Sequence, residues 1–155
     1  MKSFPNETCF VCRKHRGDVE VPGGPIYQDD LVFASHSQLT EGENDHYLGH
    51  VFLEPIRHVA EIGDLTDAEA IALGLLSRDL AKALMQTEAI THLYSFIFGD
   101  HVPHLHIHMI GRYPGAPKEY WGMKVDEWPD APRGDEVEIM KLVDRLRKYL
   151  AGEMV

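Results

Sequence analysis

The sequence predicts an α+β fold with a five-stranded antiparallel sheet and two main helices. Short β-rich segments follow one another through brief connections, which is typical of antiparallel sheets. Two longer stretches carry apolar residues at helical spacing. These helices are set apart from the runs of strands, which favours α+β over a regularly alternating α/β fold. The chain has 155 residues, enough for one domain, with an N-terminal segment at 1–25 and a C-terminal loop and helix at 111–155.

The first half of the chain contains three expected strands and the clearest helix. Strands are expected at 26–28 and 31–34, where two aspartates between them indicate a hairpin, and at 47–54, which ends before Pro55. The helix is expected at 67–87 because Thr66 and Glu69 form a capping box before it. Its apolar positions, which we expect in the core, are Ile71, Leu75, Leu76, Leu80, Ala83 and Leu84.

The second half supplies two more strands and the last helix. A fourth strand is expected at 92–98, followed by a fifth that begins after Pro103. A loop rich in Pro, Gly and aromatic residues then leads to a helix at 135–150. The apolar stripe of that helix consists of Ile139, Val143, Leu146 and Leu150.

The expected fifth strand carries three histidines in strict alternation. His104, His106 and His108 are separated by single apolar residues, which predicts a half-buried strand with all three imidazoles on one face, roughly 6.6 Å apart. Imidazole, with an unperturbed pKa near 6.5, serves as nucleophile, acid, base or metal ligand near pH 7. The row therefore predicts either chemistry at a phosphorus or carbonyl centre, or a metal site.

Composition narrows the choice of partners. The formal net charge of −10 argues against binding to a nucleic-acid polymer, but it allows a small phosphorylated substrate held at a local positive site. No apolar run of membrane-spanning length and no apolar signal-peptide core occurs, so we expect a cytoplasmic protein without a membrane partner.

The only cysteines, Cys9 and Cys12, are spaced as Cys-x-x-Cys. In a cytosolic chain this spacing indicates metal binding or redox chemistry. A thioredoxin-like site would place an amphipathic helix after the motif, and no apolar stripe follows it here. A metal site would need two further ligands from elsewhere in the chain.

The stretch His104-Leu105-His106-Ile107-His108-Met109-Ile110 resembles the histidine-triad (HIT) motif, His-φ-His-φ-His-φ-φ. The resemblance extends over about residues 9–113, because the segment 49–58 is similar to the preceding strand of that family, which ends in Pro-x-x-His. It implies a homodimeric nucleotide hydrolase or nucleotidyltransferase that acts at an α-phosphate. Dinucleoside polyphosphates and nucleotide phosphoramidates are the substrate types implied.

By this resemblance, His106 would attack phosphorus and form a covalent nucleotidyl-histidine, and no catalytic cofactor is expected. His104 and His108 would contact the phosphoryl oxygens or steady the attacking ring, and His101 would protonate or bind the leaving group. We also expect substrate contacts from four further residues, of which Ser37 stands where many relatives have an acidic residue that grips the ribose: His36, Ser37, Asp100 and Arg112.

One branch of the family also carries a structural zinc. Matched to this sequence, its four ligands are Cys9, Cys12, His58 and His104. Two thiolates and two imidazoles form a closed tetrahedral set of the kind found at structural zinc sites. The alternative for the Cys-x-x-Cys pair is two free thiols.

Two other functions remain open from the sequence. One is a metal-dependent hydrolase or oxygenase whose metal lies on the histidine row, although Arg112 beside the row favours an anion over a cation. The other is a non-catalytic nucleotide-binding protein. Neither the nucleoside nor the acceptor, water or phosphate, follows from the sequence.

Overall fold

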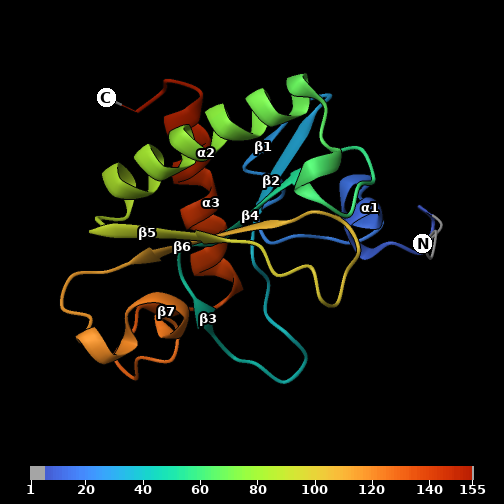
Figure 1. Ribbon diagram of the computed structural model, residues 1–155. Coiled ribbons are helices and arrows are strands. Elements are labelled where there is room, and N and C mark those ends of the chain that lie inside the picture. Colours follow the sequence, from blue (N-terminus) through green and yellow to red (C-terminus); the bar gives the residue numbers. More distant parts are fainter. Residues whose placement is uncertain (1–5, 155) are drawn as a thin grey trace.

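Five antiparallel strands form the main sheet in the order β1-β2-β4-β6-β5 (Figure 1). In this computed structural model, which describes residues 6–154, they are β1 (Tyr27–Gln28), β2 (Val32–His36), β4 (His50–Pro55), β5 (His92–Phe96) and β6 (Ile107–Arg112). The five-stranded antiparallel sheet predicted from the sequence is confirmed. The N-terminal and C-terminal segments expected at 1–25 and 111–155 extend in part beyond the described residues.

Two long helices accompany the sheet, as expected. Helix α2 (Asp67–Thr87) has the predicted bounds, and its capping box joins Thr66 and Glu69. Helix α3 (Glu136–Leu150) starts with a second capping box, between Asp135 and Glu138. Each box satisfies backbone N–H groups that a helix start leaves without partners.

Both long helices pack on one face of the sheet, with α2 along the upper side of the sheet in Figure 1 and α3 crossing beside it. The shared core is fully buried. It joins alternate strand residues to the inner stripes of the helices: Val51, Leu53, Met109, Leu80, Leu84, Leu142 and Leu146. Because side chains alternate along a strand, Phe52, Glu54 and His108 occupy the opposite face.

Helix α2 buries fewer of its apolar residues than the sequence predicts. Ile71 and Leu75 were expected in the core, but their exposed fractions are 62% and 49%. A helix that lies on a sheet buries only one stripe, and Leu73, Leu76 and Leu80 form that stripe here. The prediction for these two residues was therefore wrong.

Smaller elements complete the chain. A two-stranded ribbon that the sequence did not predict pairs β3 (His46–Tyr47) with β7 (Arg133–Gly134), below the main sheet in Figure 1. Three 3₁₀ turns lie at Ile62–Asp64, Lys118–Tyr120 and Gly122–Lys124. Among the described residues, no helix has both the length and the apolar character needed to cross a membrane.

A short helix near the N-terminus was also missed. Helix α1 (Phe10–His15) has only six residues and no apolar stripe. The Cys9 side chain caps its start by accepting from the backbone N–H of Cys12. Helix α1 places the side chains of Lys14 and His15 over the sheet face that carries Glu54.

Candidate functional site

Two of the three triad histidines lie side by side on the sheet face opposite the long helices. The ring centroids of His106 and His108 are 5.2 Å apart, and both rings are partly exposed. Nδ1 of His106 donates to the backbone carbonyl of His104 at 2.7 Å, because a carbonyl oxygen only accepts. This bond fixes the tautomer in which Nε2 of a neutral His106 keeps a free lone pair.

The first triad histidine departs from the expected row. Strand β6 begins only at Ile107, so the alternation of a strand does not extend to His104. The His104 ring is fully buried and contacts His58 and His15, with centroids 5.1 and 5.4 Å away. The expectation that all three imidazoles form one row is thus wrong; His104 supports His106 through its backbone carbonyl.

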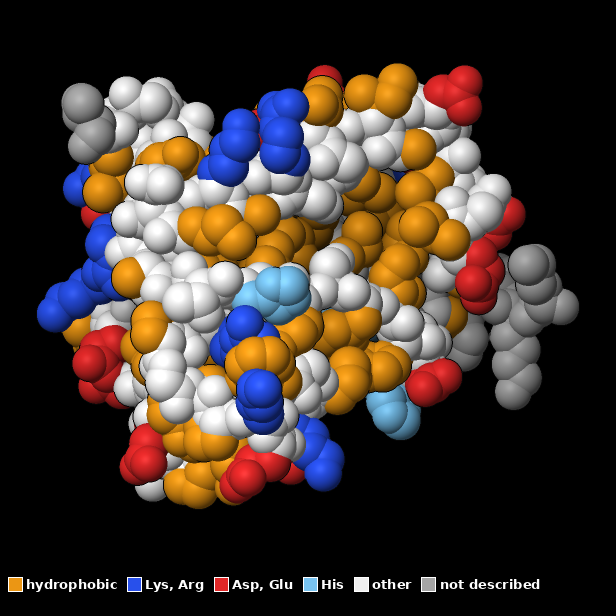
Figure 2. Space-filling model, turned by 60° about the vertical axis from the view of Figure 1, so that its left-hand side comes forward, with side chains coloured by type: hydrophobic (Ala, Val, Ile, Leu, Met, Phe, Trp, Pro, Cys, Tyr) orange, Lys and Arg blue, Asp and Glu red, His pale blue; other side chains and the backbone are white. Residues whose placement is uncertain are grey.

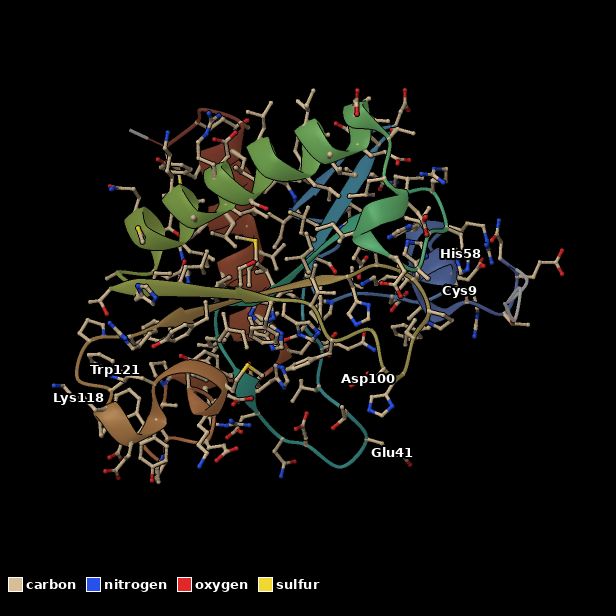
Figure 3. The ribbon with its side chains drawn as sticks, viewed as in Figure 1. Cys9, Glu41, His58, Asp100, Lys118 and Trp121 are labelled. Atoms are coloured by element: carbon tan, nitrogen blue, oxygen red, sulfur yellow. The ribbon has the colours of Figure 1, made fainter. Side chains whose placement is uncertain are left out.

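The His104 side chain instead joins the two cysteines and His58. One potential ligand atom from each of the four lies within 4.8 Å of the others. Nδ1 of His104 is 3.6 Å from Sγ of Cys9 and 3.4 Å from Sγ of Cys12. Nδ1 of His58 is 3.3 Å from Sγ of Cys12. Figure 3 shows Cys9 and His58 together beside α1.

These distances fit a tetrahedral metal. Zinc–sulfur and zinc–nitrogen bonds of about 2.3 and 2.0 Å place neighbouring sulfur and nitrogen ligands about 3.5 Å apart. Nε2 of His104 donates to the carbonyl of Pro55 at 2.8 Å, which leaves Nδ1 free to bind a metal. Burial and the adjacent Cys9 sulfur raise the pKa of Cys12 to about 12, so a pair of thiolates here needs a cation to offset its charge.

A cavity of about 140 Å³ opens beside His106 and His108. Its other lining residues come from α1, from β4 and from the segment before the triad: Phe10, Val11, Lys14, Phe52, Glu54 and Val102. A larger hollow, of about 660 Å³, lies between the N-terminal segment and the start of α3. Neither His106 nor His108 lines that hollow, so we place the candidate reaction site in the smaller cavity.

The charged residues in this cavity wall are paired with each other. Nζ of Lys14 is 2.5 Å from Oε1 of Glu54, and Nε2 of His15 is 2.9 Å from Oε2. Lys14 and Glu54 are 6% and 1% exposed. Burial raises the pKa of Glu54, but the His15 hydrogen bond and the Lys14 charge outweigh it, so its pKa lies below the usual value.

His108 is held from the adjacent strand. Nε2 of His50 lies 3.1 Å from Nδ1 of His108. Burial lowers the pKa of His50 to about 3 and that of His108 to about 4; the charge of His108 adds to the first shift, and the charge of His106 adds to the second. Both rings are therefore neutral near pH 7, and one of the two facing nitrogens carries the shared proton. If His50 donates, Nε2 of His108 is a donor.

His36 does not reach the cavity. The ring is 1% exposed; Nδ1 donates to the carbonyl of Ser37 at 2.6 Å, and Nε2 accepts from the backbone N–H of Gly49 at 3.0 Å. Both ring nitrogens are satisfied inside the protein, so the structure argues against the expected substrate contact. Burial lowers the pKa of His36 to about 4, consistent with a neutral structural ring.

Ser37, which directly follows β2, and His46, the first residue of β3, form a polar cluster with Glu43 of the loop between them. Oγ of Ser37 is 2.6 Å from Nε2 of His46, and Nδ1 of His46 is 3.3 Å from a carboxylate oxygen of Glu43. Ser37 is 5% exposed. The structure thus places Ser37 among polar side chains, and its expected substrate contact stays a prediction.

Asp100 and His101 are exposed on the loop between β5 and the triad segment, and Figure 3 shows Asp100 at the outer end of this loop. Val102 of the same loop lines the cavity. The loop therefore borders the reaction site, but neither Asp100 nor His101 lines the cavity in this structure.

Arg112 lies far from His106. It ends β6, six residues beyond His106, which corresponds to about 20 Å along a strand. Its guanidinium stacks on Trp121, 3.8 Å from the ring centroid, and donates to the Tyr94 hydroxyl at 2.8 Å. Figure 3 shows Trp121 and Cys9 at opposite ends of the sheet. Within one chain Arg112 therefore does not reach a phosphate attached to His106, and its expected substrate contact stays a prediction.

Sequence reasoning missed the six residues that line the cavity besides His106 and His108. Three of them form an ion pair or pack against the triad: Lys14, Phe52 and Glu54. The position of Glu54 carried a usable signal, because it places a carboxylate directly after the apolar run 51–53 of the strand. A buried carboxylate predicts a basic partner. No pattern in the sequence indicated that α1 supplies that partner.

The match to a family model agrees with this geometry. The HIT domain model matches residues 19–115, more than half of the 155-residue chain. The chain belongs to the HIT domain family. The match begins after Cys9 and Cys12, so it does not bear on the first two metal-ligand candidates of this HIT protein.

Solved structures show the same fold at low sequence identity. A hypothetical histidine triad nucleotide-binding protein from Sulfolobus tokodaii strain 7 is 16% identical, with a TM-score of 0.70 and 93% of each chain covered. A Zn-bound histidine triad family protein from Mycobacterium smegmatis is 19% identical, with a TM-score of 0.67 and 96% of each chain covered. Plasmodium falciparum diadenosine triphosphate hydrolase is 15% identical, with a TM-score of 0.60 and coverage of 84% of this chain and 78% of the other.

Proposed function

We propose that this HIT protein is a nucleotide hydrolase or nucleotidyltransferase that acts at an α-phosphate through a covalent nucleotidyl-His106. The observation that carries the proposal is the hydrogen bond from Nδ1 of His106 to the His104 carbonyl. In the neutral form of the ring this bond places the proton on Nδ1 and leaves the Nε2 lone pair available for attack, beside a cavity that the ring itself lines. Membership of the HIT family and the likeness to a diadenosine triphosphate hydrolase support the class of reaction.

In the first step, Nε2 of His106 forms a bond to the α-phosphorus, and the bond from phosphorus to the leaving group breaks. In the second, water or another acceptor attacks the phosphorus and releases His106. His108 lines the same cavity, so its Nε2–H can donate to a phosphoryl oxygen or to the leaving group when His50 donates to its Nδ1. The exposed His101 would assist the leaving group only after its loop moves toward the cavity.

A metal on the histidine row is the less favoured alternative. Among the residues described, the cluster with metal-ligand geometry contains His104 but neither His106 nor His108. We propose that this cluster holds a structural zinc, which cross-links α1 to the segments that carry His58 and His104. The Zn-bound relative from Mycobacterium smegmatis supports this assignment.

Intact-protein mass spectrometry tests the reaction. The protein is mixed with dinucleoside polyphosphates and nucleotide phosphoramidates, quenched early and weighed. We expect an added mass of one nucleoside monophosphate less water in the native protein and in a His92→Asn control, whose histidine is exposed on β5. The adduct should be absent from His106→Asn, which should still bind nucleotide. An adduct that persists in His106→Asn, or turnover that stops at once when a chelator is added to folded protein, would refute the mechanism.

The homodimer implied by the resemblance remains a proposal. Strand β5 lies at the edge of the sheet and pairs only with β6 among the described strands, so its outer backbone groups are available for pairing. Figure 2 shows exposed hydrophobic side chains among basic ones, seen with the left side of Figure 1 turned forward. Light scattering coupled to size-exclusion chromatography would distinguish a mass near 35 kDa, roughly twice the chain mass of 17.6 kDa, from the monomer.

A further inference from the structure

The wall of the reaction cavity contains a buried ion pair that the proposed chemistry does not use. Lys14 and Glu54 line the cavity with His106 and His108, and both side chains are almost completely buried. Taking two charges out of water is costly, and well-packed apolar residues often stabilise such a position equally well. The stability of the fold therefore does not explain why a buried ion pair occurs here.

The pair is poorly suited to hold a phosphate. The ammonium of Lys14 lies 2.5 Å from a carboxylate oxygen of Glu54, so the charge of one offsets the charge of the other. Glu54 directly follows Leu53, whose partner on β6 is Ile107, and it lines the same cavity as His106. A carboxylate in that position repels a polyphosphate unless Lys14 stays paired with it.

The pair does offer a hydrogen-bond donor directly beside an acceptor. Lys14 has three N–H donors, one of which points at Glu54. The two carboxylate oxygens of Glu54 have about four acceptor sites, and Lys14 and His15 occupy two of them. A neutral ligand group that carries an acceptor next to a donor can therefore bind both residues without separating them.

The remaining walls favour a flat ring as the carrier of that group. Phe10, Val11, Phe52 and Val102 line the same cavity, and Phe10 is 42% exposed. Apolar and aromatic walls with a few well-placed polar groups are typical of pockets for small ligands. Within a nucleotide, the base is the neutral ring with polar groups along its edge.

Resting on the proposed nucleotidyl transfer, we infer that the Lys14–Glu54 pair is a specificity-determining element that recognises the nucleobase edge. It reads an acceptor adjacent to a donor, as the carbonyl oxygen and ring N–H of guanine provide. A base without these groups covers the pair without using the remaining Lys14 N–H donors and Glu54 acceptor sites, and a polar site discriminates strongly against such a mismatch.

The test compares guanosine 5′-phosphoramidate with purine riboside 5′-phosphoramidate, whose ring has neither the carbonyl nor the N–H on that edge. We expect native kcat/KM to favour guanosine by at least about tenfold. In the double variant K14M/E54Q this ratio should fall to within about twofold of one. Both charges are removed together so that neither remains buried without a partner of opposite charge. The amide introduced by E54Q still accepts a hydrogen bond from His15.

The control is Lys148→Met, which removes an exposed ion pair with Asp144 and should leave the ratio unchanged. Thermal unfolding confirms that each variant is folded, and mass spectrometry confirms that it still forms the His106 adduct. A native ratio near one, or an unchanged ratio in folded K14M/E54Q, overturns the inference while the His106 adduct preserves the proposed function. Absence of any adduct in the native protein overturns both.

Discussion

Removing Lys14 alone should lower the free energy of unfolding, because it leaves a buried carboxylate without its lysine partner beside the cavity at His106. Lys14→Met leaves the Glu54 carboxylate, only 1% exposed, with His15 as its remaining side-chain partner. Breaking a buried ion pair from one side typically costs about 3–5 kcal/mol of folding free energy. Because His15 still binds Oε2 at 2.9 Å, we expect the lower end of that range, about 3 kcal/mol, near pH 7.5.

The same loss should depend on pH in a defined direction. In the native protein the pKa of Glu54 lies below its usual value of 4.5, since His15 and Lys14 outweigh the effect of burial. The stabilisation is therefore fully present above the unfolded pKa and is lost as the pH falls through the folded pKa. Without Lys14, burial dominates and the carboxyl protonates more readily. The deficit of Lys14→Met should thus begin to shrink as the pH falls through the raised Glu54 pKa of the variant, and it should be smaller at about pH 4 than at about pH 7.5.

Urea unfolding of native protein and variant at about pH 7.5 and about pH 4, compared at equal metal content, measures this difference. K14M/E54Q should recover most of the stability, because it strands no charge, and Lys148→Met should change it by less than about 0.5 kcal/mol. The reasoning is refuted if Lys14→Met loses less than about 1 kcal/mol at neutral pH, or if the double variant is no more stable than the single one.

Three further predictions follow from the site and the core. Cys12→Ser should reduce bound zinc from about one per chain to near zero by elemental analysis, and undiminished zinc would exclude the proposed ligand set. Gly111→Ala should destabilise the protein by about 1–3 kcal/mol in urea unfolding, because the added Cβ would lie 2.7 Å from a side-chain carbon of Ile90. Gly74→Ala, with open space around it, should be neutral or stabilising, and equal losses at both positions would contradict this explanation. The folded pKa of His36, about 4, lies below its unfolded value of 6.5, so its contribution is present above pH 6.5 and lost as the pH falls toward 4. Stability should therefore rise with pH across this window, and His36→Asn should flatten that slope.

Local patterns in the sequence determined the elements of this fold. The capping box at Thr66 and Glu69 and the apolar repeat after it placed α2 at its observed bounds. Short β-rich segments between turn residues predicted the antiparallel sheet, although the triad strand begins at Ile107 rather than directly after Pro103. These features depend on neighbours within a few positions, so the sequence alone displays them.

The resemblance to the HIT family predicts the four metal-ligand candidates, and the structure brings their ligand atoms together. Cys9 and His104 are separated by 95 positions, and no periodic pattern connects them. Their residue types indicate a metal site, but their positions in the sequence do not show that they lie close together. The tertiary structure brings their Sγ and Nδ1 atoms to 3.6 Å from each other.

The arrangement around His106 is decided by tertiary structure. Alternation in the sequence placed three imidazoles on one face, but the chain leaves the sheet before Ile107, and His104 turns toward the cysteines. The sequence also gave no reason to bring Lys14 to Glu54, 40 positions away. The spacing of apolar residues along the sequence shows which side of a helix or strand faces the core. The chemistry of a cavity depends on which elements pack around it, and only the folded chain determines that.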